Sequence, residues 1–98
     1  MPVVSFFSNI DKNLTIVITG AFSFTDQKDF MKAYADKEIG RCILDMGLTL
    51  DIDRSALGLL LLLKDTIATD TDISITHCNS KVRKILIMAR FDKSFHIE

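Results

Sequence analysis

The stretch DIDRSALGLLLLLKD, from Asp51 to Asp65, follows an apolar segment of strand length and leads into a run of leucines. Its length and composition predict a helix over residues 55–69. Asp53 and Ser55 are both residue types that cap a helix N-terminus, where backbone N–H groups lack partners. We therefore expect a strand-to-helix junction here, with a serine hydroxyl at the start of the helix.

The leucine run contains more apolar side chains than one helical face requires. Helical periodicity predicts one face formed by Leu57, Leu60 and Leu61. The other leucines then spread over the remaining faces: Leu59, Leu62 and Leu63. This excess indicates either packing on a neighbouring helix or an exposed docking surface. Gly58 weakens the helix relative to Ala, which indicates either close approach of a partner or loop backbone, or relief of crowding inside the domain.

The rest of the chain alternates between strand-like and helix-like segments, which predicts an α/β domain with mostly parallel central strands. Strands are expected at residues 3–8, 13–20, 41–46, 71–77 and 94–98, and helices at residues 25–38, 55–69 and 79–91. The near-continuous apolar run at 41–46 predicts a strand covered on both sides.

Two further helices have clear local signals. In the first, Thr25 is the expected N-cap, Phe24 a hydrophobic staple, and the buried face is formed by Phe30, Ala33 and Tyr34. In the last, Asn79 or Ser80 is the expected cap. Its apolar stripe is expected to comprise Val82, Ile85, Leu86 and Ala89.

Composition narrows the function classes. With 98 residues, 48% of them hydrophobic, the chain is expected to form one domain over residues 1–98. A net charge of -1 lacks the basic field of a nucleic-acid-binding protein. The longest apolar run is too short for a membrane span and no secretory signal opens the chain. Cys42 is expected to be a buried free thiol, which with Cys78 far away in sequence fits a reducing cytoplasm.

No arrangement of residues predicts catalysis, a metal or a cofactor. The segment GLTLDIDRSALG, residues 47–58, lacks the ending of a phosphate-binding P-loop. Ser55 has no nucleophile-elbow context, and neither His77 nor His96 lies near it in sequence. Ser55 therefore has two interpretations: a simple cap, or a phosphate acceptor. A phosphate would be held by helix amides and would add about −1.5 to −2 charge beside Asp51 and Asp53.

The order of elements, with LTLDIDRSALGLLLLLKD (residues 48–65) at its centre, resembles the STAS domain of bacterial anti-sigma factor antagonists. That family's signature is an apolar residue, any residue, Asp-Ser-[Ser/Thr]-Gly-Leu-Gly and then an apolar helix. Here the signature corresponds to residues 52–58. The family's later strand, Asn-containing turn and helix correspond to ISITHCNSKVRKILIMARFDKSF, residues 73–95.

The resemblance implies a single small STAS-type domain with a mixed central sheet of about four to five strands and helices packed on it. It also implies a cytoplasmic, non-enzymatic protein without a cofactor. The unphosphorylated form would bind an anti-sigma factor with serine kinase activity and so release a sigma factor, and a phosphatase would reverse the phosphorylation. No nucleic-acid or membrane contact is expected, and the chain would be a monomer or a weak dimer.

The departures from the signature select the expected site residues. The family commonly phosphorylates the residue after the Asp, which here is Arg54, so Ser55 is the expected phosphorylation site and Arg54 could pair with the phosphate. In the loop after the second strand, Ala21 and Ser23 stand where the family often has an acid. The expected contact surface comprises Asp53, Arg54, Ser55, Leu57, Gly58 and Leu61. The alternative is a constitutive STAS scaffold or sensor subunit that phosphate does not control.

Overall fold

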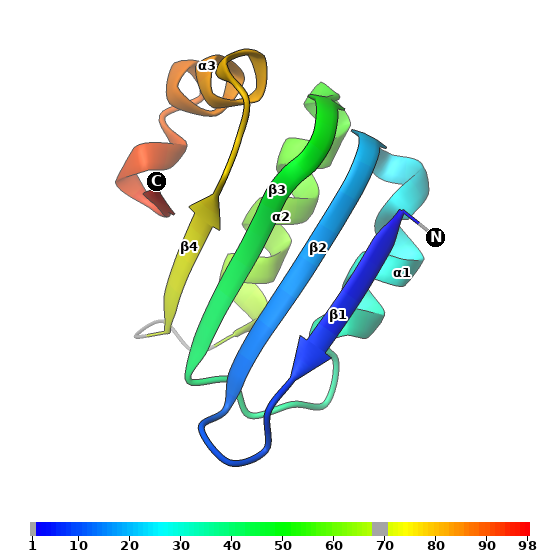
Figure 1. Cartoon of the computed structure of the whole chain (residues 1–98), viewed down its shortest axis with the longest axis vertical. Coiled ribbons are helices and arrows are strands. Elements are labelled where there is room, and N and C mark those ends of the chain that lie inside the picture. Colours follow the sequence, from blue (N-terminus) through cyan, green and yellow to red (C-terminus); the bar gives the residue numbers. More distant parts are fainter. Residues whose placement is uncertain (1, 68–70) are drawn as a thin grey trace.

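The computed structural model describes residues 2–67 and 71–98 and shows a five-stranded sheet with three α-helices (Figure 1). The α/β class and the predicted order of strands and helices are confirmed. The elements in chain order are β1 (Val3–Phe7), β2 (Asn13–Phe22), the 3-10 turn η1 (Phe24–Asp26), α1 (Gln27–Tyr34), β3 (Arg41–Ile52), α2 (Arg54–Thr66), β4 (Asp72–Thr76), α3 (Ser80–Met88), the 3-10 turn η2 (Phe91–Lys93) and β5 (His96–Ile97).

The sheet has the strand order β1-β2-β3-β4-β5. β1 pairs antiparallel with β2, and every other neighbouring pair is parallel. Because β2, β3 and β4 run in the same direction, their carboxyl ends meet at one end of the sheet. The predicted mixed sheet with parallel central strands is therefore confirmed.

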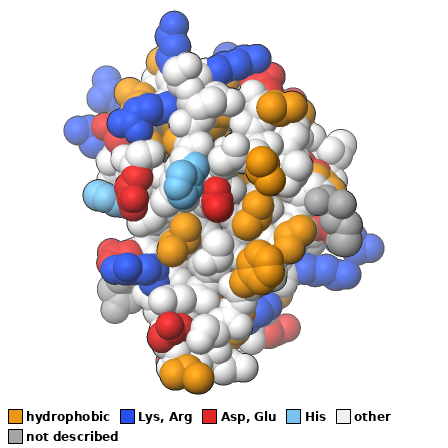
Figure 2. All heavy atoms as spheres, viewed as in Figure 1, with side chains coloured by type: hydrophobic (Ala, Val, Ile, Leu, Met, Phe, Trp, Pro, Cys, Tyr) orange, Lys and Arg blue, Asp and Glu red, His pale blue; other side chains and the backbone are white. Residues whose placement is uncertain are grey.

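The helices α1 and α2 lie behind one face of this sheet (Figure 1). Leu44 and Met46 of β3 are fully buried beneath them, whereas Ile43 and Asp45 on the opposite face are only half-buried. Figure 2, which shows the face opposite these helices, has apolar side chains at the surface over β1, β2 and β3. The prediction of a strand covered on both sides is therefore wrong, because neighbouring strands on the uncovered face are enough to shield an apolar run in part.

The orientation of α2 about its own axis differs from the prediction. Its buried side chains are Ala56, Leu59, Leu60 and Leu63. Leu57 is half-buried, and Leu61 and Leu62 are exposed. Two rotations of this helix offer leucines to the sheet, so the periodicity of the sequence does not choose between them. The helix begins one residue earlier than predicted and ends at Thr66, and the predicted end at residues 68–69 falls outside the described residues.

The start of α1 also differs from the prediction. Thr25 lies inside η1 rather than at a cap, and Asp26 is the N-cap of α1. The Ser23 N–H donates to Asp26 Oδ2 at 3.1 Å, so this carboxylate closes the turn. Phe24 is 55% exposed and does not act as a staple. The predicted buried face of α1 is confirmed: Phe30, Ala33 and Tyr34 are all buried.

The prediction for α3 is correct at its start. Asn79 is the cap, because its Oδ1 accepts the Val82 N–H at 2.8 Å. Val82 and Leu86 are buried, but Ala89 is exposed, so the apolar stripe is shorter than predicted.

The prediction for Cys42 is confirmed, since it is buried and free. Burial raises the pKa of its thiol to about 12, so the reactive thiolate is scarce at neutral pH.

Two adjacent leucines of α2 provide a test of the helix rotation. Leu60 is fully buried, whereas Leu61 is 46% exposed. We expect Leu60→Ala to lower the free energy of unfolding by about 2–5 kcal/mol, because it leaves a cavity in the core. Leu61→Ala should change it by less than about 0.5 kcal/mol. Urea denaturation followed by circular dichroism measures both, and equal losses would contradict the orientation of α2.

Candidate functional site

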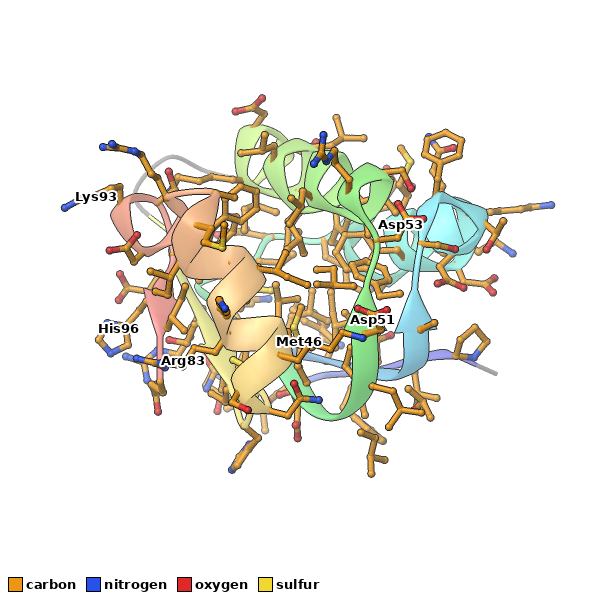
Figure 3. The ribbon with its side chains drawn as sticks, turned by 90° about the horizontal axis from the view of Figure 1, so that it is seen from above. Met46, Asp51, Asp53, Arg83, Lys93 and His96 are labelled. Atoms are coloured by element: carbon orange, nitrogen blue, oxygen red, sulfur yellow. The ribbon has the colours of Figure 1, made fainter. Side chains whose placement is uncertain are left out.

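The candidate site lies at the carboxyl ends of β2 and β3, where β3 leads into α2. Phe22 and Ile52 are neighbours in the last register pair of these strands. The Asp53 N–H then donates to the Phe22 carbonyl at 2.9 Å, so the two chain segments stay together past the end of the sheet. Figure 3 looks onto this end and shows Asp51 and Asp53 at the junction. The sequence-predicted junction is therefore present in the fold.

Asp53 and Ser55 form a closed pair at the start of α2. Asp53 is the N-cap, and its Oδ1 accepts the Ser55 N–H at 2.6 Å. The same oxygen accepts the Ser55 hydroxyl at 2.7 Å. The hydrogen bond from the Ser55 side chain, and after it the one from the Ser55 backbone, lowers the pKa of Asp53. The carboxylate is thus negatively charged at neutral pH and in direct contact with the hydroxyl.

The Ser55 hydroxyl has a second partner from a distant part of the chain. The Phe24 N–H donates to Ser55 Oγ at 3.1 Å, which fastens η1 to the start of α2. The oxygen therefore donates one hydrogen bond and accepts another. The contact places the Phe24 backbone beside the predicted phosphorylation site, and the Phe24 side chain is exposed. The predicted role of Phe24 as a staple for the first helix does not include this contact, because no local pattern relates residues so far apart in the sequence.

The predicted contact residues lie on one continuous stretch of α2 and its cap. Asp53, Arg54 and Ser55 are exposed, and Leu57 is half-buried. A Cβ added at Gly58 would meet nothing within 4 Å among the described residues. Among the described residues, neither crowding from other segments nor a neighbouring loop therefore accounts for this glycine.

A groove of about 410 Å³ opens between α2 and α3 beside these residues. Its lining comes from the end of β3, from α2 and from α3: Ile52, Arg54, Leu57, Ile85, Met88 and Ala89. Met88 is 74% exposed at its rim. The α3 side of this groove is absent from the predicted contact surface, because only the fold brings α3 next to the start of α2. The one feature of the sequence that points to this side of the groove is the apolar end of the predicted last helix.

Charged and polar side chains fix α3 to the same end of the sheet. Asn79 Nδ2 donates to the Thr49 carbonyl at 3.1 Å, while its Oδ1 caps α3. Lys81 Nζ lies 3.3 Å from Asp51 Oδ2. Asp51 is therefore paired with a cation, whereas Asp53 is bound only by neutral donors among the contacts described. Of the two carboxylates, Asp53 is the one in contact with Ser55.

Two classes of site have no support in the described part of the chain. No group of three or more His, Cys, Asp or Glu residues is arranged to hold a metal ion within residues 2–67 and 71–98. Among the helices of those same residues, none combines the length and apolar character needed to cross a bilayer.

The contact between Ser55 and Asp53 predicts a measurable titration. A lowered folded-state pKa means that the interaction stabilises the fold at neutral pH and is lost as the pH falls through that pKa. We expect Ser55→Ala to raise the pKa of Asp53 toward about 3.9, the value of an unperturbed Asp. NMR titration of the carboxyl carbons measures this shift. Thr25→Ala removes a hydroxyl that is not hydrogen-bonded to Asp53 and should leave the pKa of Asp53 unchanged. An equal shift in both variants would contradict the hydrogen bond between Ser55 and Asp53.

Comparison with known proteins places this geometry in a family. No family model matches the chain. A STAS-domain containing protein of Pseudomonas aeruginosa is 37% identical over 100 residues, which cover 99% of each chain. A putative anti-sigma factor antagonist from Thermotoga maritima has a similar structure, with a TM-score of 0.80 and 15% identity over 97% of this chain and 84% of that one.

Two further solved structures have the same fold. An anti-sigma factor antagonist from Mycobacterium paratuberculosis has a TM-score of 0.79 and 12% identity, over 97% of this chain and 84% of that one. The anti-sigma factor antagonist SpoIIAA in its unphosphorylated form has a TM-score of 0.70 and 12% identity, over 98% and 86%. At such low identities these three structures establish the fold alone. The near-complete match to the Pseudomonas protein, together with this fold, shows that the chain belongs to the STAS-domain family.

Proposed function

We propose that this chain is a phosphorylation-switched anti-sigma factor antagonist of the cytoplasm, which acts by binding and has no catalytic activity of its own. In its unphosphorylated form it binds an anti-sigma factor with serine kinase activity and so releases a sigma factor. The observation that carries the proposal is the exposed Ser55 hydroxyl at the start of α2, beside an open apolar groove. Membership of the STAS family and the fold shared with anti-sigma factor antagonists support it.

The contacts of Ser55 give a physical reason for a switch. Phosphorylation replaces the hydroxyl hydrogen, so the donor to Asp53 Oδ1 is lost. It also adds about −1.5 to −2 charge next to that carboxylate. The two negative groups repel, while the N-terminus of α2 and the Arg54 side chain offer the phosphate compensating contacts. We therefore expect phosphorylation to rearrange the start of α2, and not only to add a phosphate to an unchanged structure.

The same change alters the surface that a partner would meet. Leu57 and Met88 present apolar atoms beside Arg54 in the unphosphorylated form. A phosphate at Ser55 makes this rim strongly negative, so an apolar or acidic surface on the partner no longer fits. The proposed contact residues are those of the α2 start: Asp53, Arg54, Ser55, Leu57, Gly58 and Leu61. Removal of the phosphate by a phosphatase restores the original surface.

The two hydrogen bonds of the Ser55 hydroxyl favour a second candidate function. A hydroxyl that joins Asp53 to η1 already has a structural role in the unmodified chain, without any action of a kinase. Arg54 stands where the family commonly has the modified residue. In this second candidate, the chain is a constitutive STAS scaffold or sensor subunit that uses the same face. The two candidates differ in whether partner binding depends on phosphate.

Charge at Ser55 should control partner binding if the first candidate is correct. We expect Ser55→Asp to weaken the complex by about 10- to 100-fold, which is about 1.4–2.8 kcal/mol, since an unfavourable charge in an interface destabilises it. Ser55→Ala should still bind. Ser80→Asp is the matched control, because Ser80 is also an exposed serine in the first turn of a helix. Affinity purification with each variant, followed by identification and titration of the bound protein, measures the effect.

Phosphorylation itself provides the complementary measurement. Incubation with the purified partner kinase and ATP should place one phosphate on Ser55, detected by mass spectrometry. A phosphate on another residue, or none, would remove the switch. If Ser55→Asp and Ser55→Ala both bind the partner like the unmodified protein, the second candidate function, a constitutive scaffold or sensor subunit, is correct.

The groove between α2 and α3 should contribute to the same complex. We expect Met88→Asp to weaken partner binding about tenfold or more, since it places a charge at an apolar interface. Ile10→Asp is the control, because Ile10 is 96% exposed on the turn between β1 and β2. Isothermal titration calorimetry compares the two variants. Equal affinities would show that the partner does not contact the α3 side of the groove.

A further inference from the structure

Among the described residues, β1 is an open edge of the sheet, since it is the first strand in the order and pairs with β2 alone (Figure 1). Its sequence is VVSFF, with no charged residue. Edge strands of soluble proteins are usually blunted by charges, by proline or by a bulge, because their free N–H and C=O groups can pair with another chain. β1 has no bulge in its pairing with β2, and the only proline is Pro2, just before the strand.

Two hydrogen bonds that flank β1 show which of its backbone groups point outward. The Pro2 carbonyl accepts the Thr19 N–H at 2.7 Å, and the Ser8 N–H donates to the Asn13 carbonyl at 3.0 Å. In an antiparallel pair the residues bonded to the partner strand alternate with residues whose N–H and C=O point away. The register is unbroken from Val3 to Phe7. The even-numbered residues therefore bond to β2, and Val3, Ser5 and Phe7 present their N–H and C=O groups at the free edge.

We infer that β1 pairs antiparallel with β1 of a second copy of this chain, about a two-fold axis at Ser5. In this register Ser5 lies opposite Ser5 of the second copy, and Val3 lies opposite Phe7. All these residues have outward-pointing backbone groups, so each of these pairs exchanges two hydrogen bonds. It is also the only antiparallel register that overlaps the whole of β1 with itself. Pro2, which has no N–H, limits the ladder at its end.

The exposed side chains of β1 match this register. Val4 and Phe6 both lie exposed on the uncovered face of the sheet. In the dimer Val4 of each copy lies opposite Phe6 of the other, in a position where antiparallel side chains approach most closely. Pairs of an aromatic and a β-branched residue stabilise neighbouring strands. Like charges do not face each other across the axis, because β1 carries none, and the net charge of -1 per chain gives little repulsion.

The dimer leaves the candidate functional site open. β1 lies at one edge of the sheet, whereas α3 lies beside β3 and β4, toward the other edge (Figure 1). The groove between α2 and α3 contains no residue of β1. The inference is therefore independent of the proposed function, and two copies would present two equivalent partner-binding faces.

Two substitutions of opposite charge at Ser5, measured alone and as a mixture, test both the dimer and its register. Sedimentation equilibrium of the full chain, over concentrations from about 10 to 500 μM, should show a monomer–dimer equilibrium. Ser5→Lys and Ser5→Glu each place like charges opposite one another and should weaken the dimer by about tenfold. An equimolar mixture of the two variants should recover the dimer, because Lys then faces Glu. Ile10→Lys adds an exposed charge outside the ladder and should behave like the unmodified chain.

Several outcomes would overturn the inference. A chain that remains monomeric at every concentration has a free edge that serves another purpose, such as pairing with an extended segment of a different protein. A dimer unaffected by Ser5→Lys uses another surface. A dimer weakened by both substitutions but not restored by their mixture does not have Ser5 on its axis. Circular dichroism of each variant establishes that the fold is retained.

Discussion

The structure at the candidate site depends on one carboxylate. Asp53 directly follows β3, caps α2 and accepts hydrogen bonds from both the N–H and the hydroxyl of Ser55. Its own N–H is bonded to the end of β2. A single residue thus sets the direction of the helix relative to the sheet and holds the hydroxyl in place. Because unpaired N–H groups at a helix start need an acceptor, the cap and the site share one physical cause.

Because Asp53 both caps α2 and holds the Ser55 hydroxyl, a modification of that hydroxyl could have a large effect. The hydroxyl joins two segments that are far apart in the sequence, the start of α2 and η1. A phosphate on that oxygen would disturb the cap, the contact with η1 and the charge of the surface together. A phosphate on an ordinary exposed serine would change only the charge. The proposed switch therefore follows from the position of Ser55 in the hydrogen-bond arrangement as much as from its exposure.

The candidate functional site and the β1 edge lie on different parts of the molecule. Helices α1 and α2 cover one face of the sheet, and no helix of the described residues covers the other face or the β1 edge (Figures 1 and 2). The carboxyl ends of β2 and β3 carry the candidate site, where α3 completes an apolar groove. Parallel strands bring their carboxyl ends together, which is why loops from different parts of the chain meet there. Pairing along β1 would use none of these residues.

The sequence by itself determined the order of elements, the parallel centre of the sheet and the junction at Asp53 and Ser55. These features depend on local periodicity and capping, which neighbouring residues specify. It did not determine the rotation of α2, since leucines lie on several of its faces, or the single-sided cover of β3. The contact of Phe24 with Ser55 and the α3 side of the groove were decided by the tertiary structure alone. Both join residues about thirty positions apart, and no local pattern records which distant segments will pack together.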